Sequence, residues 1–183
     1  MISLSTARLL LRPWRKEDEE VYYRINQNEQ VLQFLAGPLT HEQVYSFITK
    51  QNKQLQEKGY TLWAVELKST GEMIGFIGLN YVTMPVHFAP AVEIGWRLDS
   101  PFWGQGYATE GAKAALEHGF NQCHLDEIVA FTVPKNQRSR NVMERLGMKE
   151  DVTGGFDHPN LPADHPFSQH VLYRITRNES VDS

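Results

Sequence analysis

The residues best suited to chemistry lie in one stretch, residues 93–116, where a predicted strand, a glycine-rich turn and a helix follow one another. Gly104 and Gly106 allow positive φ angles and let a ligand come close to the backbone. Such a turn leaves several N–H groups pointing the same way, at the positive end of a helix dipole. The small residues within 108–112 keep the first helical turns thin, which leaves room for a diphosphate. The stretch therefore predicts an anion site that accepts phosphate.

Two segments of the chain resemble a known family. Residues 104–108 read Gly-Gln-Gly-Tyr-Ala and are similar to the end of the Q/R-x-x-G-x-G/A signature of the GNAT superfamily of acyl-CoA-dependent N-acetyltransferases. Residues 136–148 resemble that family's N-x-x-S-x-x-(apolar)-x-x-x-L-G-(F/M) helix. The sequence around the first segment resembles the branch typified by the Rim-type ribosomal-protein N-acetyltransferases. The likeness runs from residue 6 to the last predicted strand.

The resemblance implies one mixed α/β domain over residues 1–183, with a mostly antiparallel central sheet of about seven strands and about four flanking helices. In this family the fourth and fifth strands splay apart and form the cofactor cleft. The residue patterns agree, because they predict elements in the order β-αα-βββ-α-β-α-ββ. The chain ends, residues 1–5 and 178–183, are expected to fray. The predicted elements are a strand near 9–11, a helix that opens at 17–20, a helix at 40–58, a hairpin over 63–79, a strand at 91–98, a helix at 107–122, a strand at 128–133, a helix at 137–146 and a last strand at 171–175.

The resemblance also implies acetyl-CoA as cosubstrate and assigns residues to hold it. The backbone of Trp96, Arg97 and Leu98 would pair with the pantetheine amides like an added strand. Trp103 stands where the wider superfamily has Gln or Arg, so backbone contacts must carry more of the phosphate binding. Gly104, Gln105, Gly106, Tyr107, Ala108 and Thr109 would hold the diphosphate, and Asn136, Ser139 and Asn141 would line the far side of the arm. Asn136 also suits a helix N-cap, and the two roles are compatible.

Two residues are candidates for proton transfer. Glu93, on the strand before the turn, could remove a proton from an arriving amine, directly or through water. It could equally be a charge on the strand that makes a structural hydrogen bond. Many family members carry a tyrosine acid where this chain has Met143, which cannot donate a proton. Ser139, one turn earlier, could donate to the departing sulfur, or it could merely touch the cofactor.

Three histidines, His158, His165 and His170, lie close together near the C-terminus. Their spacing is irregular and interrupted by prolines, without a zinc pattern, so no metal site is predicted. We interpret the segment 156–170 as a substrate-side loop, in which His158 or His170 helps to orient the amine. Cys123 is interpreted as a packing or surface residue rather than a nucleophile.

Composition limits the possible classes of protein. The net charge of −4 and the isoelectric point near 6.0 argue against a broad nucleic-acid surface. The apolar runs fall short of the ~18 residues that a membrane span needs. A single cysteine excludes an internal disulfide and fits a reducing compartment. We therefore expect a cytoplasmic protein, monomeric or homodimeric, without membrane or direct nucleic-acid partners.

The resulting functional hypothesis is transfer of an acetyl group from acetyl-CoA to a primary amine, by direct attack in a ternary complex. By resemblance to the Rim-type branch, the acceptor would be the N-terminal α-amine of a protein or peptide. One alternative is acetylation of a small molecule such as an amino sugar, an antibiotic or a polyamine. Another is a CoA-binding sensor that has lost catalysis, which Met143 permits. A nucleotide-binding protein is disfavoured because no Gly-Lys-Ser/Thr follows the glycine turn.

Overall fold

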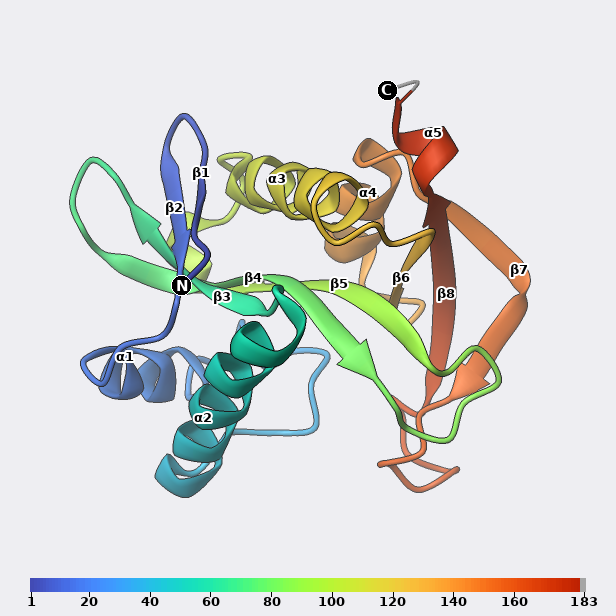
Figure 1. The fold of residues 1–183 in the computed structure, drawn as a ribbon. Helices are drawn as coiled ribbons and strands as arrows, with labels where there is room; N and C mark the ends of the chain where they lie inside the picture. The colour runs from blue at the N-terminus through green and yellow to red at the C-terminus, as the bar shows by residue number, and fades with distance from the viewer. Residues whose placement is uncertain (182–183) are drawn as a thin grey trace.

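The computed structural model describes residues 1–181 of the 183-residue chain (Figure 1). The strands are β1 (Leu4–Ser5), β2 (Leu9–Arg12), β3 (Leu62–Leu67), β4 (Met73–Val82), β5 (Ala91–Leu98), β6 (Glu127–Thr132), β7 (Lys149–Asp157) and β8 (Gln169–Thr176). The helices are α1 (Asp18–Ile25), α2 (His41–Lys58), α3 (Tyr107–Asn121), α4 (Gln137–Arg145) and α5 (Arg177–Val181), with a short 3-10 turn at Ser100–Phe102. The predicted element order is confirmed, with β1 and α5 added at the two ends.

One sheet runs through the molecule in the order β1-β2-β3-β4-β5-β6-β8-β7. Neighbouring strands are antiparallel except β5 and β6, which are parallel and pair at a single position, Glu93 with Val129. Because β1 was not predicted, β5 and β6 are the fourth and fifth strands of the predicted order, which were expected to splay apart. The cleft between them is therefore confirmed. Helices α1 and α2 cover one face of the sheet, and α3 and α4 cover the other (Figure 1).

Local signals explain the helix boundaries. Thr40 and Gln43 form a capping box at the start of α2, and Gly59 ends that helix with a φ of 78°. Gly147 follows α4 with a φ of 83°. Capping residues act within a few positions of the helix end that they fix, which is why the predicted ranges 40–58 and 137–146 lie close to the observed ones.

The two faces of the sheet have separate cores. Trp63, Ile77 and Leu116 belong to the larger core, under α3 and α4. Trp14, Tyr22 and Phe76 belong to the smaller one, under α1 and α2. Both cores end at the cleft, which is thereby walled by packed side chains on each side.

The small residues at the start of α3 correct one expectation. We expected those within 108–112 to make room for a diphosphate, but Ala112 is fully buried in the larger core. A Cβ on Gly111 would lie 2.5 Å from the Cδ1 atom of Ile77. Because they lie on the inner side of α3, Gly111 and Ala112 allow the helix to approach the sheet, and the helix is not thinned toward a ligand there.

Both chain ends include short regular elements. Leu4 and Ser5 pair with Leu11 and Leu10. Residues 178–181 lie within α5, and residues 182–183 lie outside the described part of the chain, so the fraying of the two ends stays a prediction. The sheet therefore has eight strands rather than about seven, and five helices are described rather than about four. None of the helices within residues 1–181 has the length and apolar character needed to cross a membrane.

Candidate active site

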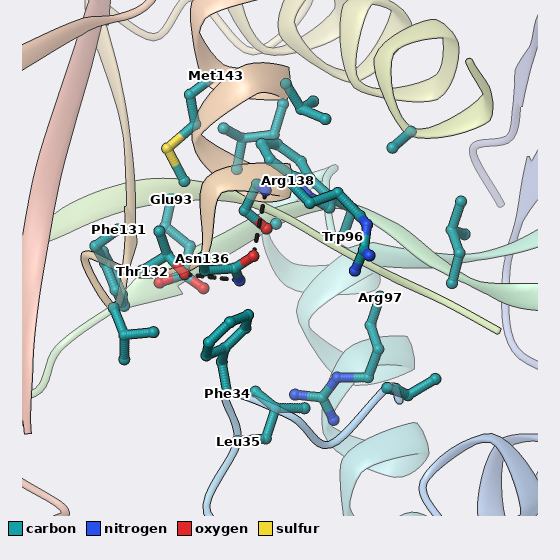
Figure 2. Close-up of a pocket in the computed structure, with 18 of the residues that line it drawn as sticks. Phe34, Leu35, Glu93, Trp96, Arg97, Phe131, Thr132, Asn136, Arg138 and Met143 are labelled. Carbon is teal, nitrogen blue, oxygen red and sulfur yellow. Dashed lines mark hydrogen bonds between the residues drawn. The ribbon is translucent and has the colours of Figure 1, made fainter. Parts of the chain in front are cut away.

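A cavity of about 350 Å³ opens where β5 and β6 separate (Figure 2). We call it the central cavity. Its walls come from residues 93–98 of β5, residues 131–133 at the end of β6, the first turns of α4, the segment 30–35 after α1, and the side chains of His158 and His170. The cavity therefore joins segments that are far apart in the sequence, at the one break in the sheet.

Strand β5 presents different side chains to the two faces of the sheet, because successive residues alternate. Val92, Ile94 and Leu98 pack into the larger core with α3. The side chains of Glu93 and Arg97 point to the opposite face of the sheet. The side chain of Arg97 accordingly reaches the end of α1, where it donates a hydrogen bond to Asn26. Glu93 and Arg97 therefore lie on the α1–α2 side of β5, and both line the central cavity.

Glu93 carries a carboxylate without a hydrogen-bond or ion-pair partner among residues 1–181. The next residue on its face of the strand is Gly95, where a side chain would begin 3.7 Å from the Oε1 atom of Glu93. Burial raises the pKa of Glu93 to about 8, and the charge of Lys50 offsets only part of that rise. The structural hydrogen bond that we considered as an alternative role has no partner in the described chain.

A second cavity, the α3 cavity, follows the glycine turn and the start of α3 and has a volume of about 770 Å³. Gly104 and Gly106 have φ angles of 73° and 80°. A Cβ on Gly104 would meet no atom within 4 Å, so open space faces the turn. Gly106 is the N-cap of α3 and provides no side-chain cap, which leaves the first N–H groups of the helix available to an anion. This arrangement fits a diphosphate such as that of CoA.

The predicted cofactor residues divide between the two cavities. The central cavity is lined by Trp96, Arg97, Leu98, Ala108, Asn136 and Ser139. The α3 cavity is lined by Gly104, Gly106, Tyr107, Thr109 and Asn141, and also by Leu98 and Ala108, which the two cavities share. Gln105 lines neither, because its side-chain Nε2 donates to the carbonyl of Pro101 at 3.2 Å. Any part that Gln105 plays must come from its backbone.

Residues at the start of α4 combine structural and lining positions. The Oδ1 atom of Asn136 accepts a hydrogen bond from the Ser139 N–H at 3.3 Å, which confirms the N-cap prediction. The Nδ2 atom of Asn136 donates to Thr132 Oγ1 at 3.0 Å and ties α4 to β6. Ser139 and Met143 both line the central cavity from this helix.

Sequence reasoning missed three cations that line the α3 cavity, Lys113, Arg138 and Arg145. Arg138 also lines the central cavity, and its guanidinium stacks on the ring of Trp103. The sequence indicated only that Trp103 replaces the usual Gln or Arg, and nothing in it identified Arg138 as the nearby cation. Sequence reasoning also missed the segment 30–35, where Phe34 and Leu35 face the cavity without any motif (Figure 2).

Two of the three histidines line the central cavity. The rings of His158 and His170 lie 5.1 Å apart between centroids, whereas His165 lies outside the cavity wall. Burial lowers the pKa of His158 and His170, so both are neutral at pH 7. The Nδ1–H of His170 donates to the Ser168 carbonyl at 3.0 Å, which leaves its Nε2 as an acceptor. Within residues 1–181, no three His, Cys, Asp or Glu side chains converge in a way that could hold a metal ion.

Comparison with known proteins decides the family. A family model described as an acetyltransferase (GNAT) domain matches residues 8–149. The chain belongs to the GNAT acetyltransferase family. It is 31% identical to the FsC-acetyl coenzyme A-N(2)-transacetylase of Aspergillus fumigatus, over 97% of this chain and 77% of that protein.

Solved structures show the same fold. A GNAT-family acetyltransferase from Bacillus anthracis has a TM-score of 0.78 and 26% identity, and the match covers 97% of this chain and 99% of that one. The ribosomal-protein-S5-alanine acetyltransferase from Vibrio fischeri has a TM-score of 0.77 and 18% identity, and the match covers 97% of this chain and 98% of that one. This GNAT protein is an acyl-CoA-dependent N-acetyltransferase.

Proposed function

We propose that this acetyltransferase moves the acetyl group of acetyl-CoA to the N-terminal α-amine of a peptide or protein, by direct attack in a ternary complex. The observation that carries the proposal is the position of Glu93. Its carboxyl group has no hydrogen-bond or ion-pair partner within residues 1–181 and lines the central cavity. It lies at the single position where β5 pairs with β6.

The thioester supplies an activated acetyl carbonyl, and the chain supplies position and proton transfer. The amine must be neutral to attack, and Glu93 takes the proton that it loses. A C–N bond forms and the C–S bond breaks. The departing sulfur takes a proton from the hydroxyl of Ser139, the hydroxyl regains one from solvent, and Glu93 releases the amine proton to solvent, so the products are the N-acetyl amide and the free CoA thiol. Orientation of two reactants in one cavity contributes about 7–11 kcal/mol in favourable cases, so these proton transfers need only supplement it.

The pKa of Glu93 bears on the choice of amine. Proton transfer is most efficient between groups of similar pKa. The pKa of Glu93 is raised to about 8, and an α-amine has a pKa of about 7.7–8.0, whereas a lysine-type alkylamine has one of about 10.4. The match favours an α-amine over the more basic amines of polyamines.

A small-molecule acceptor is the second candidate. It is favoured by the 31% identity to a relative whose name describes an N(2)-transacetylase. Among the lining residues of the central cavity, Glu93 is the one acid, so a polyamine would find a single carboxylate there. A CoA sensor without catalysis is disfavoured, because the half-buried carboxyl group of Glu93 has no partner within residues 1–181 and serves no structural contact.

The test is release of free CoA thiol from acetyl-CoA with three acceptor pools: peptides with free N-termini, amino sugars, and polyamines. Matched peptides with formylated N-termini are the control, and a calorimetric titration with acetyl-CoA runs in parallel. Release with free peptides and none with formylated ones supports the proposal. Release with amino sugars or polyamines alone would move the acceptor to the small-molecule class. Binding of acetyl-CoA without release in any pool would favour the sensor.

A further inference from the structure

Arg97 holds an unused edge of its guanidinium toward the central cavity. Its Nη1 atom donates to the Oδ1 atom of Asn26 at 2.7 Å and to the hydroxyl of Tyr22 at 3.4 Å. Within residues 1–181, Nε and Nη2 have no hydrogen-bond partner. In Figure 2 the side chain reaches toward Phe34 and Leu35, on the wall opposite α4.

The charge of Arg97 is not neutralised by the described chain. No carboxylate among residues 1–181 lies within 4.0 Å of it, although Arg12, Arg140 and Arg174 each have such a partner. Asn26 and Tyr22 are fully buried, and burial raises the pKa of Tyr22, so the phenol is neutral. Arg97 is half-buried and is held by uncharged groups, whereas charges withdrawn from water are ordinarily paired.

The free edge has the geometry that a carboxylate requires. Nε and Nη2 present two parallel N–H groups, which bind the two oxygens of a carboxylate together. Asn26 and Tyr22 hold Nη1 and so orient the plane of the group before any ligand arrives. Glu93 lies four residues from Arg97 on the same face of β5, which separates the two Cα atoms by about 13 Å. Both side chains line the central cavity, so one acceptor can lie between them.

We propose that Arg97 binds a carboxylate of the acceptor while Glu93 receives its amine. This inference rests on the proposed function and narrows it to α-amines that are followed by a carboxylate, as in amino acids and short peptides. Phe34 and Leu35 lie beside the guanidinium, so an apolar side chain on the acceptor is favoured. A polycation would meet two arginines, Arg97 and Arg138, and one acid in this cavity.

The experiment compares peptide acceptors that differ in a carboxylate remote from the amine. Leucylglycine is paired with leucylglycinamide, and kcat/KM is measured for each. In the wild-type enzyme we expect the carboxylate to be preferred at least tenfold. In Arg97→Gln we expect this ratio to fall to about one, and in Arg97→Lys to an intermediate value, because the charge remains but the paired donors are lost. Equal use of carboxylate and amide by the wild-type enzyme would overturn the inference.

A matched control separates this role from a structural one. Arg138→Gln removes the other arginine of the cavity, and the carboxylate-to-amide ratio should stay as in wild type. If Arg97 only fastened β5 to α1, Arg97→Gln would lower the rates with both members of a pair alike and leave the ratio unchanged. The melting temperature of each variant is measured alongside to confirm that it folds.

Binding measurements distinguish failure of this inference from failure of the proposed function. The affinities of N-acetyl-leucylglycine and its amide are measured by calorimetry in the presence of CoA. If no acceptor releases thiol, yet the wild-type protein binds the acid more tightly than the amide and Arg97→Gln does not, the proposed function fails and the inference stands. If thiol is released but acid and amide bind and react equally, the function stands and the inference fails.

Discussion

The guanidinium carbon of Arg138 lies 3.8 Å from the centroid of the Trp103 ring. The indole is itself fixed, because its Nε1–H donates to the carbonyl of Leu98 at 2.8 Å. A cation over an aromatic face gains about 0.5–1 kcal/mol at an exposed site. The pair therefore places a cation from α4 beside the turn that leads into α3, where the family signature would otherwise supply a Gln or Arg side chain.

Replacement of Arg138 should weaken CoA binding. We expect Arg138→Gln to raise the dissociation constant of CoA about tenfold, since hydrogen bonds to charged groups are worth about 1.5–3 kcal/mol. The affinity of the variant should also depend less on salt concentration. Calorimetric titrations with CoA at low and high salt measure both effects. Arg24→Gln, a change of an exposed arginine on α1, is the control, and equal affinities of wild type and Arg138→Gln would refute the phosphate role.

Glu93 should impose a pH dependence on the rate. Its pKa is raised to about 8, so the basic form increases as the pH rises toward and beyond that value. We expect Glu93→Gln to lower kcat/KM about 10²–10⁴-fold. The ratio of wild-type to variant kcat/KM should rise with pH and level off above about 8. Ionisation of the acceptor amine affects wild type and Glu93→Gln equally, so it cancels in this ratio. A ratio that does not change between pH 6 and 9 would exclude Glu93 as the base.

The same carboxyl group should make folding sensitive to pH. An unfolded glutamate ionises near pH 4.3, whereas Glu93 in the folded protein stays protonated up to about pH 8. Between these values the folded state binds more protons than the unfolded state, so stability falls as the pH rises. We expect Glu93→Gln to be more stable than wild type at pH 9, by on the order of 2 kcal/mol, and about equal at pH 4.

Urea unfolding at both pH values tests this prediction, with the exposed Glu20→Gln as the control. Glu20 is exposed, so its replacement should change stability by a similar amount at the two pH values. If Glu93→Gln behaves like Glu20→Gln, the carboxyl group of Glu93 is not desolvated as the structure indicates.

Ser139 should affect turnover more than cofactor binding. We expect Ser139→Ala to lower kcat about tenfold while the dissociation constant of acetyl-CoA stays within a fewfold. The backbone N–H of Ser139, which bonds to Asn136, remains in the variant, so the start of α4 is preserved. Steady-state rates and calorimetry measure the two quantities. Ser139→Thr keeps a hydroxyl and should recover part of the rate, and normal turnover in Ser139→Ala would rule out the acid role.

The parts of the fold that depend on local signals could be predicted from the sequence. Thr40, Gln43 and Gly59 fix the two ends of α2 within a few residues of themselves, and the alternation of β5 identifies a strand. Strand β1 was missed because Leu4 and Ser5 carry no pattern of their own, and they are ordered only by pairing with β2.

The parts of the site that depend on distant contacts could not be predicted. Arg138 and Trp103 lie 35 positions apart in the sequence, and only the packing of α4 against the turn brings them together. The side chain of Arg97 acquires its orientation from Asn26, on an element 71 residues away in the chain. Glu93 could be identified from its strand, but its lack of a hydrogen-bond partner within residues 1–181 is a property of the folded environment.

The single pairing of Glu93 with Val129 has a consequence for how long the protein resists degradation. Beyond this point the backbone of β5 pairs with β4 on one side but has no pairing with β6 on the other, so the sheet consists of two blocks that are joined weakly at one edge. A ligand that pairs with this backbone and packs against α4 would hold both blocks together. A ligand at a hundred times its dissociation constant adds about 2.7 kcal/mol to the stability of the state that binds it. Resistance of the chain to proteolysis should therefore follow the supply of acyl donor, so that the protein persists longest where its cosubstrate is abundant.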